Sequence, residues 1–167
     1  MTRGRRIVGG IAVAGLLLGA CGGGGDSTGQ IGEPMPDVTI HAMTDDSTTS
    51  LADIDGPAVI NLWATWCAPC RAEIPAFEEV HRARGDVVRF VGVNIGDGAE
   101  AARTFLDETG ASYDQYLDPD GYVVTDLGTT NMPVTFVIDA EGTITTRHLG
   151  AMTVANLNEA IDEALAD

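Results

Sequence analysis

Two cysteines at the end of an apolar run constrain this chain more than any other feature. The run Ala58–Trp63 has the length and character of a buried strand, and Cys67 and Cys70 follow it after a short turn. Residues 71–84 then show helical spacing, which places Cys67 at the N-terminus of a helix. Unpaired backbone N–H groups and the helix dipole stabilise a thiolate there, and the thiolate is the reactive form of cysteine. A Cys-x-x-Cys pair after a strand therefore predicts a redox site.

The N-terminus has the pattern of a secretion signal. Three arginines precede an apolar stretch at 7–18, which is too short to span a membrane comfortably. The Leu-Gly-Ala-Cys sequence at 18–21 resembles a bacterial lipobox, and the resemblance implies that Cys21 is the lipidated first residue of the mature chain. We therefore expect a lipoprotein signal peptide at 1–20, with an uncleaved anchor or cleavage elsewhere as the alternative. The rest of the chain is expected outside the cytoplasm, lipid-anchored to the bacterial cell membrane.

Composition divides the remaining chain into a tether and one domain. Residues 21–31 are rich in glycine and small polar residues, which is typical of a flexible tether. Residues 32–167 have the length of one domain with its own core. Three of the nine basic residues and none of the 25 acidic residues lie in 1–20, so the remaining chain has a formal net charge of −19. Because nucleic acid and anionic lipid favour basic surfaces, neither is an expected partner.

The cysteine count indicates a working disulfide and not a structural one. With Cys21 assigned to lipid, Cys67 and Cys70 are the remaining pair of the three cysteines. A lone pair with this spacing in an oxidising compartment is interpreted as redox-active, and it needs no cofactor. A zinc site would require two further ligands, and the three histidines do not cluster in the sequence, so no metal is expected.

The hydrophobic pattern predicts an α/β fold of alternating strands and helices. Strands joined through helices are expected to pair in parallel, whereas the last two strands form an antiparallel hairpin around 139–142. Thr153 is the expected N-cap of the last helix. In chain order the predicted elements are strands at 37–41 and 58–63, a helix at 71–84, a strand at 87–94, a helix at 99–109, a strand at 113–117, a helical turn at 123–127, strands at 134–138 and 143–149, and a helix at 154–165.

This order and the sequence Trp66-Cys67-Ala68-Pro69-Cys70 resemble the thioredoxin fold. The resemblance implies a central mixed β-sheet flanked by helices, here with an N-terminal β extension. A second mark is the stretch Asn-Met-Pro-Val-Thr-Phe-Val-Ile-Asp at 131–139. It implies that Pro133 begins a strand, follows a cis peptide bond and faces the disulfide. An ordinary trans proline at the start of a strand is the alternative.

Within the thioredoxin superfamily, residues 32–167 resemble the membrane-tethered TlpA/ResA/DsbE-like branch. Besides the expected lipid, the resemblance rests on Asn61, where cytoplasmic thioredoxins have a buried aspartate, and on Glu73, three residues after Cys70. An amide does not titrate, whereas the resemblance implies that a glutamate at this position tunes the cysteine chemistry. We infer that Glu73 accepts the proton of Cys70. A first-turn glutamate that faces water is the alternative.

The resemblance implies thiol–disulfide exchange with protein disulfides or dithiols. Cys67 would attack a partner disulfide, and Cys70 would resolve the mixed disulfide. Trp66, Met132 and Pro133 are expected to bind the extended segment of the partner. The family favours a reductant, for example of apocytochrome c thiols, that is recharged by a membrane electron donor of the CcdA/DsbD type. An oxidant in extracytoplasmic protein folding is the alternative.

Two other classes of protein share part of this pattern. A peroxiredoxin-type peroxidase has a related entry segment, but its Pro-x-x-x-Thr-x-x-Cys setting is not matched before Cys67. A copper-binding assembly factor of the Sco type has three residues between its cysteines and a histidine downstream. Here two residues separate the cysteines, and His148 is the only candidate ligand. Thiol–disulfide exchange is therefore the preferred interpretation.

Overall fold

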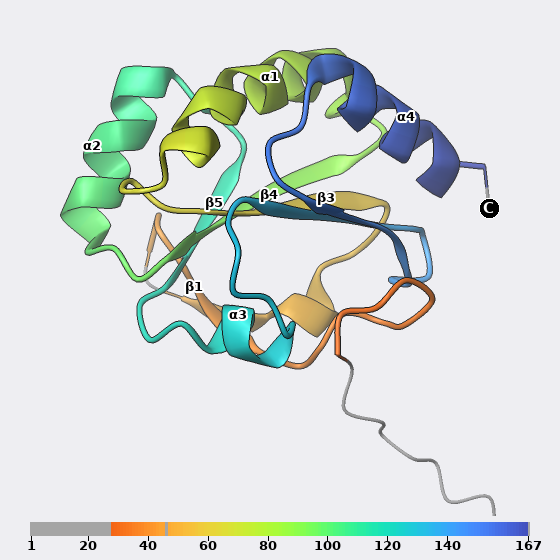
Figure 1. Cartoon of the computed structure of the whole chain (residues 1–167), viewed down its shortest axis with the longest axis horizontal. Coiled ribbons are helices and arrows are strands. Elements are labelled where there is room, and N and C mark those ends of the chain that lie inside the picture. Colours follow the sequence, from red (N-terminus) through yellow and green to blue (C-terminus); the bar gives the residue numbers. More distant parts are fainter. Residues whose placement is uncertain (1–27, 46, 167) are drawn as a thin grey trace, which may run out of the picture.

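A mixed β-sheet forms the centre of this computed structural model, which describes residues 28–45 and 47–166 (Figure 1). Its strands are β1 (Thr39–Ala42), β2 (Thr48–Ser50), β3 (Ala58–Trp63), β4 (Arg89–Ile95), β5 (Asp114–Asp118), β6 (Val134–Ile138) and β7 (Ile144–Leu149). The strand order is β2-β1-β5-β4-β3-β6-β7. Strands β3, β4 and β5 are parallel, and the other neighbours are antiparallel. The predicted signal peptide, Cys21 and the greater part of the predicted tether lie outside the described residues.

Helices cover both faces of the sheet. One face carries α1 (Ala68–Arg84), α2 (Ala99–Thr109) and α4 (Val154–Ala164), and the other carries α3 (Tyr122–Asp126) and the 3-10 turn Leu51–Asp53 (Figure 1). Apolar residues recur at helical spacing in the longer helices, so each turns one side towards the sheet. Among residues 28–45 and 47–166, no helix is long and apolar enough to cross a membrane.

The core is arranged on either side of β3. All six residues of β3 are buried, as its continuous apolar character predicted. Because side chains alternate along a strand, Ile60 and Leu62 pack on the α3 side, whereas Val59 and Trp63 pack on the side of α1, α2 and α4. Asn61 lies between Val59 and Trp63 in this alternation. The one polar side chain of β3 therefore faces the helix that carries the cysteines.

The predicted thioredoxin-like α/β fold is confirmed, including the cap of the last helix. Thr153 Oγ1 accepts a hydrogen bond from the N–H of Asn156 at 3.2 Å. One connection differs from the expected parallel crossovers, because β6 follows α3 and yet pairs antiparallel with β3. The five-residue α3 is too short to return the chain along the length of a strand. Strand β6 therefore starts at the edge of the sheet where β5 ends, and it runs in the direction opposite to β5.

Strand β2 has no counterpart in the predicted order. Its three residues, Thr48–Ser50, are all polar and show no apolar alternation. It is defined by backbone pairing with β1 at the edge of the sheet. An edge strand of this kind leaves no hydrophobic pattern from which it could be predicted.

Residues 28–31 fall in the predicted tether but contact the folded domain. The N–H and the hydroxyl of Thr28 donate to the Glu33 carboxylate at 2.9 and 3.1 Å. The Arg147 guanidinium donates to the carbonyl of Gly29 at 3.2 Å, and Gly29 is buried. Residues 28–31 therefore contact the domain although they fall in the predicted tether.

Candidate redox-active site

The loop between β3 and α1 carries Cys67 to the N-terminus of α1. Cys67 is the N-cap residue, and its Sγ accepts a hydrogen bond from the N–H of Cys70 at 3.3 Å. Pro69 lies in the first turn, where a residue without an N–H group is tolerated. Cys67 and Cys70 form a disulfide, with their Cα atoms 5.3 Å apart. The structure thus joins the two cysteines at a helix N-terminus, where the sequence pattern had placed them.

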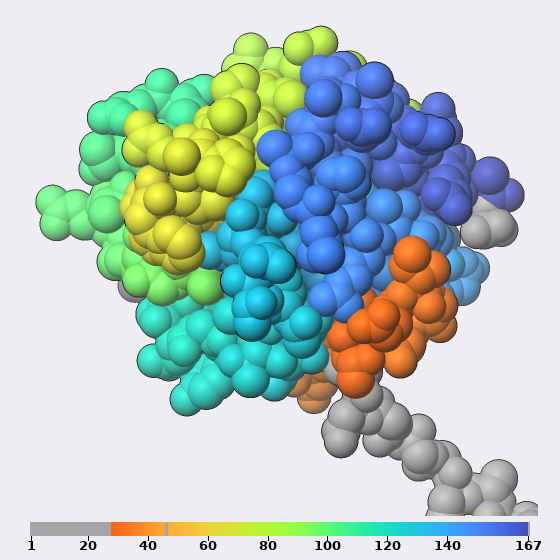
Figure 2. All heavy atoms as spheres, in the orientation of Figure 1, coloured from red at the N-terminus to blue at the C-terminus, as the bar shows by residue number. Residues whose placement is uncertain are grey.

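The two cysteines differ in exposure. Cys67 keeps 5% of its surface exposed, whereas Cys70 has none. Figure 2 shows the segment that carries them (yellow) at the surface, between the green segment of α2 and the cyan segment that leads into β6. A partner molecule can therefore reach the disulfide only from the side of Cys67.

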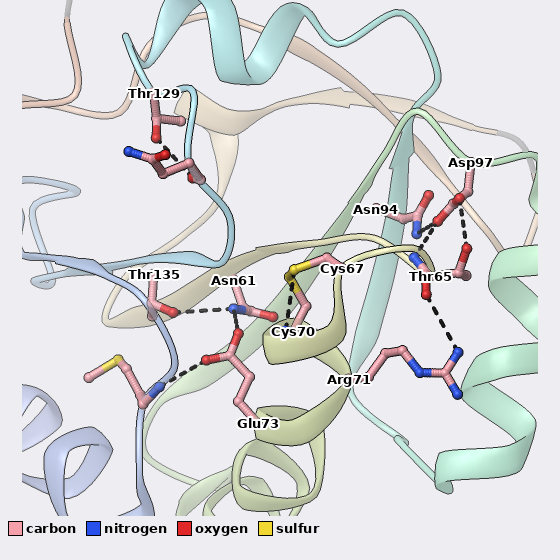
Figure 3. The surroundings of a disulfide bond; sticks show 12 residues. Asn61, Thr65, Cys67, Cys70, Arg71, Glu73, Asn94, Asp97, Thr129 and Thr135 are labelled. Carbon is pink, nitrogen blue, oxygen red and sulfur yellow. Dashed lines mark hydrogen bonds between the residues drawn. A yellow bond between two sulfur atoms is a disulfide. The ribbon is translucent and has the colours of Figure 1, made fainter.

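A buried polar network lies beside the disulfide (Figure 3). Asn61 Nδ2 donates to Glu73 Oε1 at 2.9 Å and to Thr135 Oγ1 at 3.2 Å. The backbone N–H of Met152 donates to Glu73 Oε2 at 2.9 Å. Asn61, Glu73 and Thr135 are all buried, and they come from β3, α1 and β6. The network therefore ties the first turns of the cysteine-bearing helix to segments from three other parts of the chain.

Glu73 is a buried carboxyl group and not a solvent-facing one. It is 2% exposed, so the alternative of a first-turn glutamate in water is wrong. Burial raises the pKa of Glu73 to about 7, although the hydrogen bonds from Met152 and Asn61 act in the opposite direction. A carboxyl group with a pKa near neutrality can take up or release a proton under ordinary conditions.

The start of β6 lies against the redox site. The Met132–Pro133 peptide bond is cis, as the resemblance implied. Pro133 is buried, and its carbonyl accepts a hydrogen bond from the N–H of Gly150 at 2.9 Å. Met132 packs against the hydrophobic cluster that contains both cysteines. A second cis bond, Gly56–Pro57, was not anticipated from the sequence.

The two tryptophans have opposite environments. Trp63 is fully buried at the end of β3, and its Nε1–H donates to Gln115 Oε1 at 3.0 Å. Trp66 is 67% exposed, directly before Cys67. A large apolar side chain left in solvent beside a reactive group is available for contact with a partner.

Sequence reasoning missed the residues that hold the loop before Cys67. Asp97 accepts hydrogen bonds from Thr65 and from Asn94, and Arg71 donates to the Thr65 carbonyl at 3.5 Å. A signal for Asp97 was present in the sequence, because it follows the strand that is the parallel neighbour of β3. The carboxyl ends of neighbouring parallel strands meet at one edge of the sheet, and functional loops gather there.

The described residues contain no cluster with metal-binding character. Across residues 28–45 and 47–166, no group of three or more His, Cys, Asp or Glu side chains is placed to hold a metal ion. The Asn61 amide, the Thr135 hydroxyl and the Glu73 carboxyl of the buried network already share hydrogen bonds with one another.

Comparison with known proteins agrees with the geometry of the site. Residues 30–161 match the family described as Redoxin, a region that includes both cysteines, Glu73 and Pro133. The thiol:disulfide interchange protein HelX of Rhodobacter capsulatus is 34% identical over 142 residues, which cover 83% of this chain and 79% of HelX. The thioredoxin-like protein YneN of Bacillus subtilis is 31% identical over 137 residues, which cover 80% of this chain and 79% of YneN. A solved structure from Chlorobium tepidum, described as a thiol:disulfide interchange protein DsbE, superposes with a TM-score of 0.72 at 26% identity, covering 81% of this chain and 97% of that chain.

Proposed function

This chain belongs to the Redoxin family and is a thioredoxin-like thiol:disulfide oxidoreductase, and on that basis we propose that it reduces disulfides of partner proteins outside the cytoplasm. The observation that carries the proposal is the pair formed by Cys67 at a helix N-terminus and the fully buried Cys70. Such a pair supplies one sulfur that meets the partner and one that stays shielded until the mixed disulfide has formed.

The proposed cycle starts from the dithiol form. The Cys67 thiolate attacks one sulfur of the partner disulfide, forms a mixed disulfide and releases the other partner sulfur as a thiolate. Cys70 then loses its proton and attacks Cys67 Sγ, which releases the second partner sulfur and closes the Cys67–Cys70 disulfide. Two electrons have passed to the partner, and both of its thiolates take up protons. The protein's own cysteines suffice for this exchange.

Glu73 is proposed to accept the proton that Cys70 loses. The carboxyl is buried close to the first turn of α1, and its pKa of about 7 lies between that of an ordinary carboxyl and that of a thiol. Asn61 donates one hydrogen bond to this carboxyl, and the buried Oδ1 of Asn61 has no partner within the described part of the chain. Rotation of the Asn61 amide would turn that oxygen towards Glu73, where it accepts a hydrogen bond from the protonated carboxyl.

Several features favour the direction of reduction over oxidation. Pro69 has no N–H to offer a thiolate, and neither residue between the cysteines is positively charged. The ionised form of Glu73 places a negative charge where it opposes a thiolate on Cys70. These features subtract from the thiolate stabilisation that the helix N-terminus provides. Less stabilisation of the thiolate makes the dithiol form less stable relative to the disulfide, which lowers the reduction potential. The resemblance of residues 32–167 to the TlpA/ResA/DsbE-like branch, which implies a reductant, supports the same direction.

The proposal includes a place of action and an electron donor. The lipobox-like sequence at 18–21 supports lipidation of Cys21 and anchoring on the outer side of the bacterial cell membrane. A membrane dithiol of the CcdA/DsbD type would then return the Cys67–Cys70 disulfide to the dithiol form. The shortness of the segment between Cys21 and the folded part favours a donor that lies in the same membrane.

The test of direction is the reduction potential of the Cys67–Cys70 pair, measured by equilibrating the full-length chain with glutathione buffers. We expect a value below about −230 mV, in the range of reducing members of the thioredoxin superfamily. A value above about −150 mV would identify the chain as an oxidant of extracytoplasmic proteins and would overturn the proposed direction.

A further inference from the structure

Thr65 is held through its N–H, its hydroxyl and its carbonyl (Figure 3). Its N–H donates to Asp97 Oδ2 at 2.7 Å, and its hydroxyl donates to Asp97 Oδ1 at 2.8 Å. Arg71 Nη1 donates to the Thr65 carbonyl at 3.5 Å. Hydrogen bonds to an ionised carboxylate are stronger than neutral ones, so the Asp97 contacts fix both the backbone and the side chain of Thr65.

The sheet sets the position of Asp97. Residue Asn94 is paired in register with Trp63, because β3 and β4 are parallel neighbours. The fully buried Asn94 donates its Nδ2–H to Asp97 Oδ2 at 2.8 Å. Loops that leave the carboxyl ends of neighbouring parallel strands lie side by side, which brings the Asp97 carboxylate to Thr65. Asp97 is thus a rigidly supported acceptor.

Arg71 connects the same loop to α2. Its guanidinium lies 4.9 Å from the centre of the Phe105 ring, and Phe105 is 4% exposed. Thr65, Arg71 and Phe105 line an open groove of about 610 Å³ beside the site. Thr65, which Asp97 and Arg71 both contact, is followed directly in the chain by the exposed Trp66 and then by Cys67.

We propose that Asp97 and Arg71 are positioning residues for disulfide exchange, which through Thr65 fix Trp66, directly before Cys67, in the orientation that a protein partner meets. The inference rests on the proposed function, because it assumes that the partner that reacts with Cys67 is a protein. A loop that is already fixed loses little conformational freedom when the partner binds, so the effect falls on the KM for the partner. A small thiol touches only the sulfur, and its reaction does not depend on the orientation of Trp66.

The experiment compares the wild-type full-length chain with Asp97→Ala and Thr65→Val. Each reduced protein is mixed with insulin at increasing concentration, and the oxidised form is separately mixed with dithiothreitol. We expect Asp97→Ala to raise the KM for insulin on the order of tenfold, because the partner must then order the loosened loop and the Trp66 side chain when it binds. Thr65→Val, which keeps the N–H bond, is expected to raise the KM by a smaller factor. The rate with dithiothreitol and the Cys67–Cys70 reduction potential are expected to stay those of the wild type.

Two controls separate positioning from charge and from folding. Glu100→Ala removes an exposed carboxylate from the same groove without touching Thr65, so its KM should equal that of the wild type. Thr65→Ser keeps the hydroxyl, so it should restore the wild-type KM. If Asp97→Ala lost the same share of its rate with insulin and with dithiothreitol, or kept the wild-type KM for insulin, the positioning role would be overturned. The proposed function would still stand in either case, provided that the wild type reduces insulin. A wild type that does not reduce insulin would overturn both.

Discussion

The carboxyl group of Glu73 accepts hydrogen bonds from the Asn61 side chain and from the N–H of Met152, 79 residues further along the chain. Both bonds favour its ionised form, yet burial wins and raises its pKa to about 7. In the unfolded chain the same group titrates near its ordinary value. At the scale of single residues, this difference couples the folding of the domain to pH.

The sign of this coupling follows from which state holds the proton more tightly. Between pH 4.5 and about 7 the folded chain keeps the Glu73 proton that the unfolded chain has released, so the free energy of unfolding falls as the pH rises. The contribution is on the order of 3 kcal/mol across this window. The Glu73→Gln variant should lack this pH-dependent contribution to the free energy of unfolding. Urea unfolding of the oxidised proteins at pH 5 and pH 8 is the measurement.

Glu79→Gln is the matched control for this prediction. Glu79 lies on the same helix but is exposed, so its removal should leave the pH dependence of the wild type intact. If Glu73→Gln and the wild type gave parallel curves of unfolding free energy against pH, the raised pKa of Glu73 would be refuted.

The unequal exposure of the cysteines gives a second prediction at the residue scale. Cys70→Ser should trap a partner as a lasting mixed disulfide with Cys67, because no buried sulfur remains to resolve it. Cys67→Ser should abolish exchange, since a partner cannot reach Cys70. Non-reducing electrophoresis after mixing with a disulfide-bonded protein distinguishes these results. Free turnover in Cys70→Ser would contradict the assigned roles.

At the scale of elements, the N-terminus of α4 supports the same carboxyl group. Thr153 caps α4, accepting from the N–H of Asn156 and donating to the Asn156 side chain at 2.8 Å. The residue before this cap is Met152, whose N–H contacts Glu73. The cap therefore stabilises α4 and also fixes the segment before it, which contacts Glu73 of α1.

Thr153→Ala should lower the free energy of unfolding by about 1 kcal/mol, the usual cost of losing an N-cap side chain. Chemical unfolding at one fixed pH measures it. Thr104→Ala in α2 is a suitable control, because Thr104 is exposed and its hydroxyl donates to the Glu100 carbonyl of the same helix. Thr104→Ala should change the free energy of unfolding by no more than about 0.5 kcal/mol. Equal changes in the two variants would contradict a stabilising role of the Thr153 cap.

At the scale of the whole molecule, residues before the glycine at 32 contact the domain. Arg147 of β7 binds the Gly29 carbonyl, and it also donates to the carbonyl of Leu127 at 3.1 Å. One guanidinium thus fastens the N-terminal segment to the segment after α3. The attachment site of any tether is therefore part of the domain surface.

A chain that starts at residue 32 should unfold at a lower temperature than one that starts at residue 28. The loss should be a few degrees, since about 1 kcal/mol corresponds to roughly 2–4 °C in a domain of this size. Thermal unfolding followed by circular dichroism tests it. Equal unfolding temperatures would mean that residues 28–31 act only as tether.

Most of the fold could be predicted because its signals are local. The apolar run of β3, the helical spacing of α4 and the turn between β6 and β7 lie within short windows of sequence. Strand β2 could not be predicted, since polar residues at a sheet edge carry no hydrophobic pattern. The antiparallel direction of β6 could not be predicted either, because it depends on the length of α3, which a pattern of three apolar residues does not define.

The candidate site divides in the same way. The redox pair was determined by the sequence itself, because two cysteines two residues apart at a strand–helix junction bring their sulfurs together through local geometry. The environment of Glu73 and the contact between Thr65 and Asp97 were decided only by the tertiary structure. Burial and hydrogen bonding there depend on segments far apart in the chain. No local window of sequence contains the segments that bury Glu73 or the carboxylate that holds Thr65.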